Sequence, residues 1–244
     1  MISIICVYNN KANLEEQLMK SLNFFIEKNF ELVLVDNVKN QFNCSADALN
    51  YGAKRATGSV LIFSHQDIFI KNEKQFYDFC NFVEQCCFGT IVGAAGVVEK
   101  NKKIFGNYTT GLELISGEIK MINQPMKVAC VDECFFGMTK ETYEKHCFDN
   151  VLCDNWHLYA VEISLFARES GSDVFVFPIE IHHYSNGTIT KSYMKGLLRI
   201  SDRYRKSFKY IWTCCYKVNS SWIYTRSLYI VWYLHRFIIG KSLE

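Results

Sequence analysis

The sequence predicts an α/β fold with a mostly parallel central sheet flanked by helices. Apolar, strand-like runs alternate with amphipathic, helix-like segments through the first 100 residues. This alternation is typical of parallel sheets that are wound with helices on both faces. Hydrophobic residues make up 49% of the 244-residue chain and only 2 residues are proline, so the chain can bury a large core without long linkers.

The predicted strands are short runs of β-branched and apolar residues, and they span residues 2–8, 30–35, 60–63, 90–98, 127–131, 134–138 and 174–182. The predicted helices carry apolar residues three and four positions apart, and they span residues 13–28, 45–54, 73–86, a short segment from 139, and 155–170. We expect Ser45 to cap the second helix and Gly171 to end the last one. Pro178 places the final strand at an edge or a bulge.

Polar residues follow each of the first three strands, and they are Tyr8-Asn9, Asp36-Asn37 and His65-Gln66-Asp67. Such ends lie side by side in a doubly wound sheet, where ligands bind. Asp and His can hold a divalent metal, which can hold a phosphate. A single such Asp is more often a turn or cap residue, but recurrence at three strand ends favours a nucleotide or phosphate site. The absence of a glycine-rich phosphate loop after the first strand argues against a dinucleotide dehydrogenase or a P-loop enzyme.

Six segments carry a resemblance to a known family, and they are SIICVYNN, ELVLVDN, ALNYGAKRATGSVLIFSHQDI, VDECFFGMTKETYEKHCFDN, WHLYAVEISLFARESG and IHHYSNG. Their order over about residues 2–188 resembles the GT-A-fold glycosyltransferases of family 2, especially a bacterial branch with His-Gln-Asp in place of Asp-x-Asp. The resemblance implies an inverting transferase. It would move a sugar from a nucleotide-sugar donor, foremost a UDP-sugar, to a surface glycan such as a capsule or O-antigen, built on a polyprenyl-linked acceptor.

The resemblance also implies residue roles. It assigns contacts with the nucleotide to Cys6, Val7, Tyr8, Asp36, Asn50, His65 and Gln66. Asp67 would coordinate Mn²⁺ or Mg²⁺, with His183 of the pattern His183-Tyr184-Ser185-Asn186-Gly187 and with His65 as a second possible ligand. The sugar or acceptor pocket would include Asp132, Glu133, Trp156 and His157, although a core-packing role is equally open for the tryptophan.

One departure from the family pattern concerns the catalytic base. The branch places an Asp where this chain has Ala160, and alanine cannot accept a proton. Glu162 and Asp154 are the candidate replacements, with the Asp132-Glu133 pair as a further option. Glu162 can equally be a salt-bridged helix residue, and Asp154 can be a helix cap. The alternative function is therefore a catalytically impaired GT-A-like protein that binds sugar nucleotides or serves in an assembly.

The C-terminal part, residues 189–244, is expected to be a helical extension of a 1–188 catalytic domain. From residue 188 onward the chain has eleven Lys and Arg against two acids, so about +9, while the remainder has sixteen against twenty-three, so about −7. Three interpretations stay open: a helix on an anionic membrane surface, packing on the domain or in a homodimer, and, least favoured, nucleic-acid binding. With no signal peptide recognised, we expect a cytoplasmic protein at the inner face of the membrane.

Overall fold

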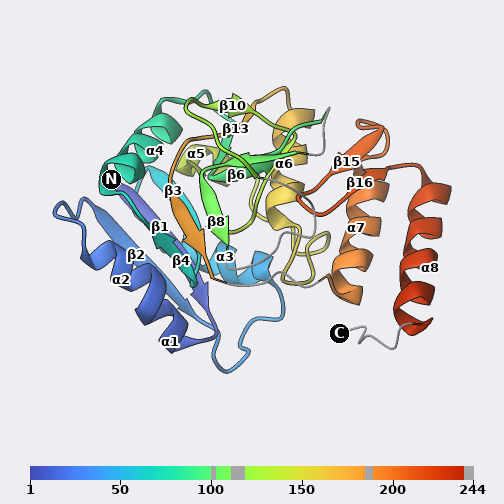
Figure 1. Ribbon diagram of the computed structural model, residues 1–244, viewed down its shortest axis with the longest axis horizontal. Coiled ribbons are helices and arrows are strands. Elements are labelled where there is room, and N and C mark those ends of the chain that lie inside the picture. Colours follow the sequence, from blue (N-terminus) through green and yellow to red (C-terminus); the bar gives the residue numbers. More distant parts are fainter. Residues whose placement is uncertain (100–102, 111–118, 185–188, 239–244) are drawn as a thin grey trace.

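The computed structural model describes residues 1–99, 103–110, 119–184 and 189–238. Its centre is a seven-stranded sheet in the order β10-β13-β5-β12-β3-β1-β2 (Figure 1). The strands are β1 (Ile2–Tyr8), β2 (Phe30–Asp36), β3 (Val60–His65), β5 (Ile91–Gly93), β10 (Met126–Lys127), β12 (Phe135–Thr139) and β13 (Val174–Val176). β1 pairs in parallel with β2 and β3, and β13 pairs in parallel with β5, whereas β12 runs antiparallel to β3 and β5. The predicted α/β fold with a mostly parallel sheet is confirmed.

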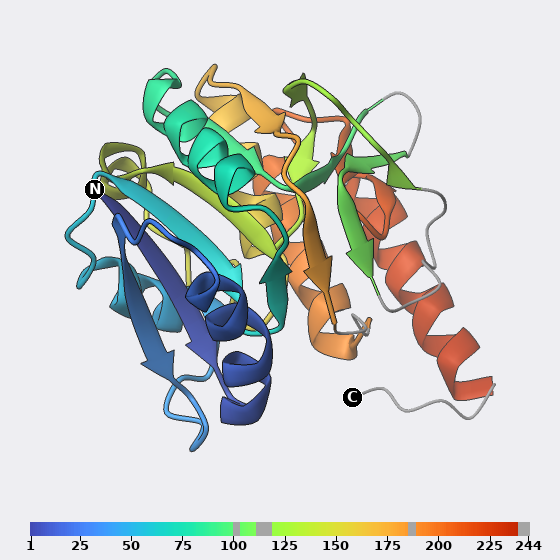
Figure 2. The ribbon, with the colours of Figure 1, turned by 60° about the vertical axis from the view of Figure 1, so that its left-hand side comes forward.

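Helices cover both faces of this sheet (Figure 2). They are α1 (Lys11–Leu14), a π-helical turn η1 (Glu15–Met19), α2 (Lys20–Asn23), α3 (Ser45–Ala53), α4 (Glu73–Gln85), α5 (Lys140–Lys145) and α6 (Tyr159–Glu169). Side chains of β1 alternate between two hydrophobic clusters: Ile5 packs with α3 and α6, and Ile4 packs with α1 and α4. Burial on both faces explains why the strand is a continuous apolar run.

Two smaller sheets extend the molecule. A four-stranded sheet contains β11 (Cys130–Val131), β6 (Ala95–Val97), β7 (Ile104–Gly106) and β9 (Ile119–Lys120). A three-stranded sheet contains β4 (Ile68–Ile70), β14 (Ile181–His183) and β8 (Tyr108–Thr110). Because β4 follows β3 directly, its antiparallel pairing with β14 brings the late part of the chain to the carboxyl end of β3.

Several local predictions were wrong. The predicted strands over residues 90–98 and 127–131 are each divided between the central sheet and the four-stranded sheet, and the helix predicted over residues 13–28 runs from Lys11 to Asn23. Ser45 does not cap α3, because the cap position is Cys44 and the Ser45 hydroxyl donates to the Asn155 carbonyl at 2.9 Å. The last domain helix begins at Tyr159, after Leu158 adopts a left-handed backbone with φ of 70°. The predicted strand over residues 174–182 is two strands, β13 and β14, which are separated by the segment that contains Pro178.

The C-terminal part contains the expected helices, α7 (Lys191–Tyr204) and α8 (Trp222–Ile238), with a hairpin of β15 (Tyr210–Trp212) and β16 (Lys217–Asn219) between them. Buried side chains of α7 and β15 belong to the same hydrophobic cluster as α6. Separate folding of residues 1–188 stays a prediction. Among the described residues, no helix combines the length and the apolar character needed to cross a membrane.

Candidate metal and nucleotide site

Three metal-ligating side chains converge at the carboxyl end of β3. His65 ends β3, Asp67 follows two residues later, and the pairing of His183 with Ile68 places the β14 end beside them. His183 Nε2 lies 3.4 Å from Asp67 Oδ1 and 3.3 Å from His65 Nδ1. One ligand atom from each residue lies within 4.8 Å of the others. The three predicted metal ligands are therefore together, although they come from distant parts of the sequence.

The state of His65 is set by its surroundings. Burial, reinforced by repulsion from His183, lowers its pKa to about 4, so the ring is neutral at pH 7. Its Nε2 lies 2.8 Å from the Tyr159 hydroxyl, which donates its single proton to the Glu133 carbonyl at 3.3 Å. The hydroxyl must then accept from His65 Nε2–H, which leaves the lone pair of Nδ1 facing His183 and Asp67.

This donor set fits a divalent transition metal. Two imidazole nitrogens and one carboxylate oxygen suit divalent transition metals as a class, whereas Mg²⁺ prefers an all-oxygen shell. His183 and Asp67 are both buried, and Tyr159 orients the third ligand from behind. The neutral, oriented His65 imidazole is ready to bind a metal without first losing a proton.

The neighbouring strand ends form a second polar pair. Tyr8 and Asp36 face each other in the register of β1 and β2, and the Tyr8 hydroxyl donates to Asp36 Oδ2 at 2.9 Å. The Val38 amide donates to Asp36 Oδ1 at 2.8 Å and, with the Tyr8 hydroxyl, lowers the pKa of this carboxyl. An exposed, ionised carboxylate beside an aromatic ring can recognise the N–H group of a nucleotide base.

Gln66 joins two of these loops. Its Oε1 accepts from the Asn9 amide at 3.0 Å and the Asn10 amide at 2.9 Å. Its Nε2 donates to the Asn9 side chain at 2.8 Å. Gln66 thus connects the end of β3 to the end of β1, and these hydrogen bonds hold the two loops in place.

The other predicted nucleotide residues lie farther into the fold. Asn50 Oδ1 accepts from the Tyr143 hydroxyl at 3.0 Å and the Phe148 amide at 3.1 Å, so its side chain holds the segment after α5. Cys6 is fully buried, and burial raises the pKa of its thiol well above the usual range. Val7 is partly buried against the core. The contacts of these three residues are thus with the core and with the segment after α5.

An acidic pair lies between β11 and β12. The Glu133 carboxylate accepts the Leu158 amide directly before α6, and burial together with Asp132 raises the pKa of Glu133 to about 8. The neighbouring Asp132 accepts the Cys134 amide at 3.0 Å. The pKa of His65 is lowered overall, and the charges of Asp132 and Asp67 partly oppose that lowering. The acidic pair therefore lies beside the metal cluster.

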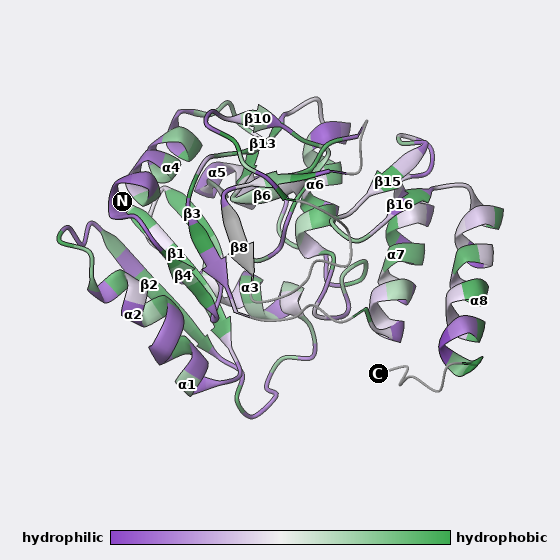
Figure 3. Cartoon of the chain, viewed as in Figure 1, coloured by the Kyte–Doolittle hydropathy of each residue, from purple (hydrophilic) through white to green (hydrophobic). Residues whose placement is uncertain are grey.

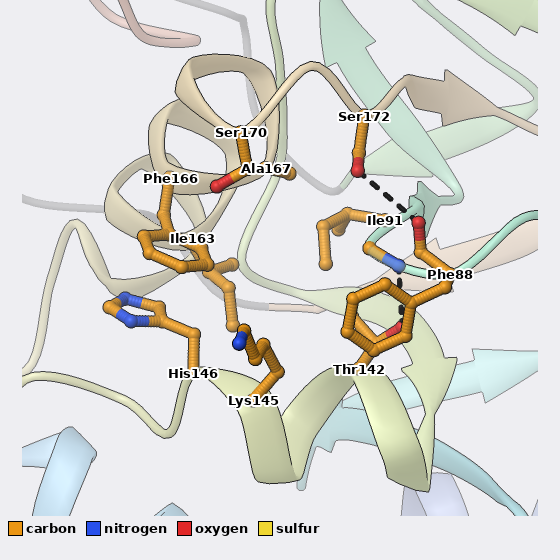
Figure 4. Close-up of a pocket in the computed structure, with 11 residues that line it drawn as sticks. Phe88, Ile91, Thr142, Lys145, His146, Ile163, Phe166, Ala167, Ser170 and Ser172 are labelled. Carbon is orange, nitrogen blue, oxygen red and sulfur yellow. Dashed lines mark hydrogen bonds between the residues drawn. The ribbon is translucent and has the colours of Figure 1, made fainter.

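Glu162 and Asp154 have other partners. Buried Glu162 accepts the Tyr204 hydroxyl at 2.7 Å and lies 3.2 Å from His146 Nε2. The His146 ring stacks on Phe166 and lines a cavity of about 100 Å³ between α5 and α6 (Figure 4). Asp154 forms an ion pair with Arg199 of α7. Both carboxylates thus tie α6 and the segment before it to neighbouring elements.

The predicted acceptor residues lie just before α6. Trp156 is 41% exposed, so it is not a core residue. The ring of half-buried His157 packs edge-on against Tyr193, with 5.6 Å between the ring centroids. Burial lowers the pKa of His157. Ala160 is fully buried. Ser185, Asn186 and Gly187 of the late motif lie outside the described residues, as do parts of the loop over residues 99–124.

The sequence did not reveal two contributors to this site. Tyr159 orients His65, and its only signal was its place beside Ala160 in the segment that resembles the family. The hairpin β15–β16 packs beside the acidic pair: Cys130 Sγ donates to the Trp212 carbonyl at 3.0 Å, and burial, together with the charge of Asp132, raises the pKa of Cys214. The C-terminal part thus forms one wall of the site.

Comparisons with known proteins support the architecture. No protein-family model and no curated protein matches the chain. Among solved structures, GalNAc-T7 with UDP, GalNAc and Mn²⁺ aligns with a TM-score of 0.59 and 12% identity, over 85% of this chain and 51% of that one. TarS 1–349 of S. aureus in complex with UDP-GlcNAc aligns with a TM-score of 0.52 and 13% identity, over 82% of this chain and 65% of that one. The chain thus spans about half of the first structure and just under two thirds of the second, and it has the GT-A fold of these glycosyltransferases.

Proposed function

We propose that this protein is a glycosyltransferase that uses a nucleotide-sugar donor, foremost a UDP-sugar, in the manner of the bacterial family 2 branch that its motifs resemble. The observation that carries the proposal is the convergence of His65, Asp67 and His183 at the edge of the sheet where Tyr8 and Asp36 also lie. The two solved structures compared above are complexes with UDP, GalNAc and Mn²⁺ and with UDP-GlcNAc.

The donor is held from two sides. We assign the base and ribose to the Tyr8–Asp36 pair, with Val7 beneath it and Cys6, Asn50 and Gln66 fixing the surrounding loops. His65, Asp67 and His183 would hold Mn²⁺ in preference to Mg²⁺, and this ion supplies positive charge to the diphosphate leaving group. The neutral state of His65 favours binding at neutral pH.

Glu133 is our choice of catalytic base. Its carboxylate is bound to the Leu158 amide, two residues before Ala160, and so lies at the end of α6 where the family carries its Asp. Glu162 and Asp154 are occupied by Tyr204, His146 and Arg199. In a single displacement with inversion, the acceptor oxygen bonds to the anomeric carbon, its proton passes to Glu133, and the bond to the nucleoside diphosphate breaks.

The acceptor would approach over Trp156 and His157, beside Asp132. An exposed indole face suits the apolar face of a sugar ring. We propose a glycan acceptor on a polyprenyl carrier at the cytoplasmic face of the membrane, as in the assembly of a capsule or O-antigen. The basic C-terminal part, which borders the acidic pair through its hairpin, supports an anionic acceptor.

Ala160 favours a second candidate function, a sugar-nucleotide-binding protein without transferase activity. Alanine at the family's base position removes the group that takes the acceptor proton. The fold and the metal cluster would then serve binding alone, within an assembly. The two functions share donor binding and differ only in turnover.

Calorimetric titration of UDP tests the shared part. We expect binding with Mn²⁺ that is at least about ten-fold tighter than with Mg²⁺ or with chelator, because imidazole ligands favour the transition metal. Metal-independent binding, or none, would overturn both functions. Release of UDP from UDP-sugars in the presence of polyprenyl-diphosphate sugars then separates the transferase from the binder.

A further inference from the structure

Helix α8 has two unlike faces. One face packs on the body of the protein, where Leu228, Tyr229 and Trp232 contact the core cluster. Arg226 binds Asp202 of α7, with Nη1 2.7 Å from Oδ1, and Lys191 at the other end of α7 lies 5.8 Å from the Tyr233 ring centroid. The two helices are therefore antiparallel neighbours at one end of the molecule (Figure 1).

The opposite face of α8 is an exposed apolar stripe. Its members are each between 51% and 79% exposed, and they are Ile223, Ile230, Val231, Leu234, Phe237 and Ile238. Their spacings of 7, 8, 11, 14 and 15 residues from the first place them on one side of a helix with 3.6 residues per turn. The helix is about 25 Å long at 1.5 Å per residue. Exposed Ser227 interrupts the stripe after Ile223, and the apolar part is continuous from Ile230 to Ile238. Figure 3 shows apolar residues recurring along α8.

Amphipathic aromatic rings line both margins of the stripe, and one margin also carries Arg226, which is paired with Asp202. At 3.6 residues per turn, Tyr224 and His235 lie along one margin, and Arg226 and Tyr233 lie along the other. Trp222 is exposed next to the second margin, with the Arg226 guanidinium 4.8 Å from its ring centroid. This arrangement is typical of a helix that lies in the plane of a membrane interface, with aromatic rings at headgroup level and cations toward phosphates.

The net charge decides between the possible partners. Residues 188–244 carry eleven Lys and Arg against two acids. Arg205, Lys206 and Lys209 are exposed between α7 and β15. A second copy docked stripe to stripe would bring these like charges together, and a nucleic acid would leave the aliphatic stripe in water. An anionic lipid leaflet offers both hydrocarbon for the stripe and negative charge for the basic C-terminal part.

We propose that the apolar stripe of α8 binds an anionic membrane surface, with the helix axis parallel to the bilayer and the remainder of the protein above it. The stripe enters the boundary between headgroups and acyl chains, and the surrounding Lys and Arg side chains meet the lipid phosphates. This inference does not depend on the identity of the sugar donor, so its failure would leave the proposed function standing.

Vesicle sedimentation of the full chain tests the inference. We expect binding to phosphatidylcholine vesicles that contain phosphatidylglycerol, weaker binding to phosphatidylcholine alone, and loss of binding at high salt. The triple variant Ile230→Ser, Leu234→Ser, Phe237→Ser should bind roughly ten-fold more weakly or worse, because less apolar surface enters the lipid.

A matched control changes three exposed apolar residues elsewhere: Ile26→Ser, Met121→Ser and Val151→Ser, which should bind like the unchanged protein. Since the stripe residues are exposed, the stripe variant should keep its thermal unfolding midpoint. As a measurement on intact α8, brominated lipid should quench the fluorescence of a Phe237→Trp variant. Three results would overturn the inference. One is that the protein does not sediment with anionic vesicles, and another is that the control variant loses binding as much as the stripe variant does. The third is a dimer that the stripe variant converts to monomers while vesicle binding stays unchanged.

Discussion

The Tyr159 hydroxyl lies 2.8 Å from His65 Nε2, and this contact decides which nitrogen of His65 faces His183 and Asp67. Because the same hydroxyl donates to the Glu133 carbonyl, it accepts from His65 and keeps Nδ1 unprotonated. Tyr159 therefore acts on the metal site through a ligand that it orients.

Replacing Tyr159 with Phe should weaken Mn²⁺-dependent UDP binding by about ten-fold or more, since the losses from partners of metal-bound histidines are of this size. Calorimetry with Mn²⁺ measures the effect. The control is Tyr204→Phe, which also removes a buried hydroxyl bond, to Glu162, but lies outside the metal cluster and the donor residues. Equal weakening in both variants would assign Tyr159 to stability alone.

Adjacent histidines on β14 provide the sharpest test of the metal cluster. His183 is paired with Ile68 beside Asp67, whereas His182 alternates to the other side of the strand and packs against Tyr184 at 4.2 Å. We expect His183→Ala and Asp67→Asn to abolish Mn²⁺-dependent UDP binding and His182→Ala to change it little. Electron paramagnetic resonance of bound Mn²⁺ gives an independent measure, and equal Mn²⁺ binding by His183→Ala would contradict the assignment.

Glu133 should make folding stability depend on pH. Its pKa is about 8 in the folded protein because of burial and Asp132, against an ordinary value of 4.5. The folded state thus binds the extra proton between pH 4.5 and 8, and the contribution of Glu133 to stability is present below pH 4.5 and is lost as the pH rises through 8. Urea unfolding should show that Glu133→Gln stabilises the protein at pH 8 relative to pH 5.

The same variant tests the base. Glu133→Gln should lower kcat of sugar transfer by a factor of about 100 or more while Mn²⁺-dependent UDP binding is retained. In the unchanged protein, kcat/KM should rise with pH as Glu133 loses its proton. A bound divalent cation lowers the pKa of a nearby carboxyl, so the midpoint should lie at or below 8. Full activity of Glu133→Gln would remove it from the mechanism.

The sequence predicted the elements of this site better than its contacts. Apolar runs with polar ends were enough to place Tyr8, Asp36 and His65 at one edge of the sheet, because parallel strands align their carboxyl ends. The β4–β14 register that brings in His183 links positions more than 100 residues apart, and only the family resemblance pointed to it. Hydrogen bonds such as that of Tyr159 with His65 depend on tertiary packing, which periodicity does not encode.

A variant of Glu162 tests whether this carboxylate is structural or catalytic. It is buried between Tyr204 and His146, so Glu162→Gln should lower the free energy of unfolding by about 1–3 kcal/mol. Transfer activity, measured well below the unfolding midpoint, should remain within a few-fold of the unchanged protein. Tyr204→Phe is the companion variant, because it removes the same hydrogen bond from the other side. A loss of activity of a factor of 100 or more in Glu162→Gln, with UDP binding intact, would restore Glu162 as the base.

The variant Ala160→Asp tests whether the protein has lost its catalytic base or carries it at Glu133 instead of position 160. Ala160 is fully buried next to Tyr159, and the carboxylate of Glu133 already lies at this end of α6. A new carboxylate here would be buried beside a second carboxyl group in a site with little water, so we expect a loss of about 2 kcal/mol or more in unfolding free energy and no gain in transfer. Ala160→Asn, which adds similar volume without charge, isolates the electrostatic part. If Ala160→Asp instead creates transferase activity in a protein that otherwise only binds UDP, the base was lost at this position, and the binding function is the correct one.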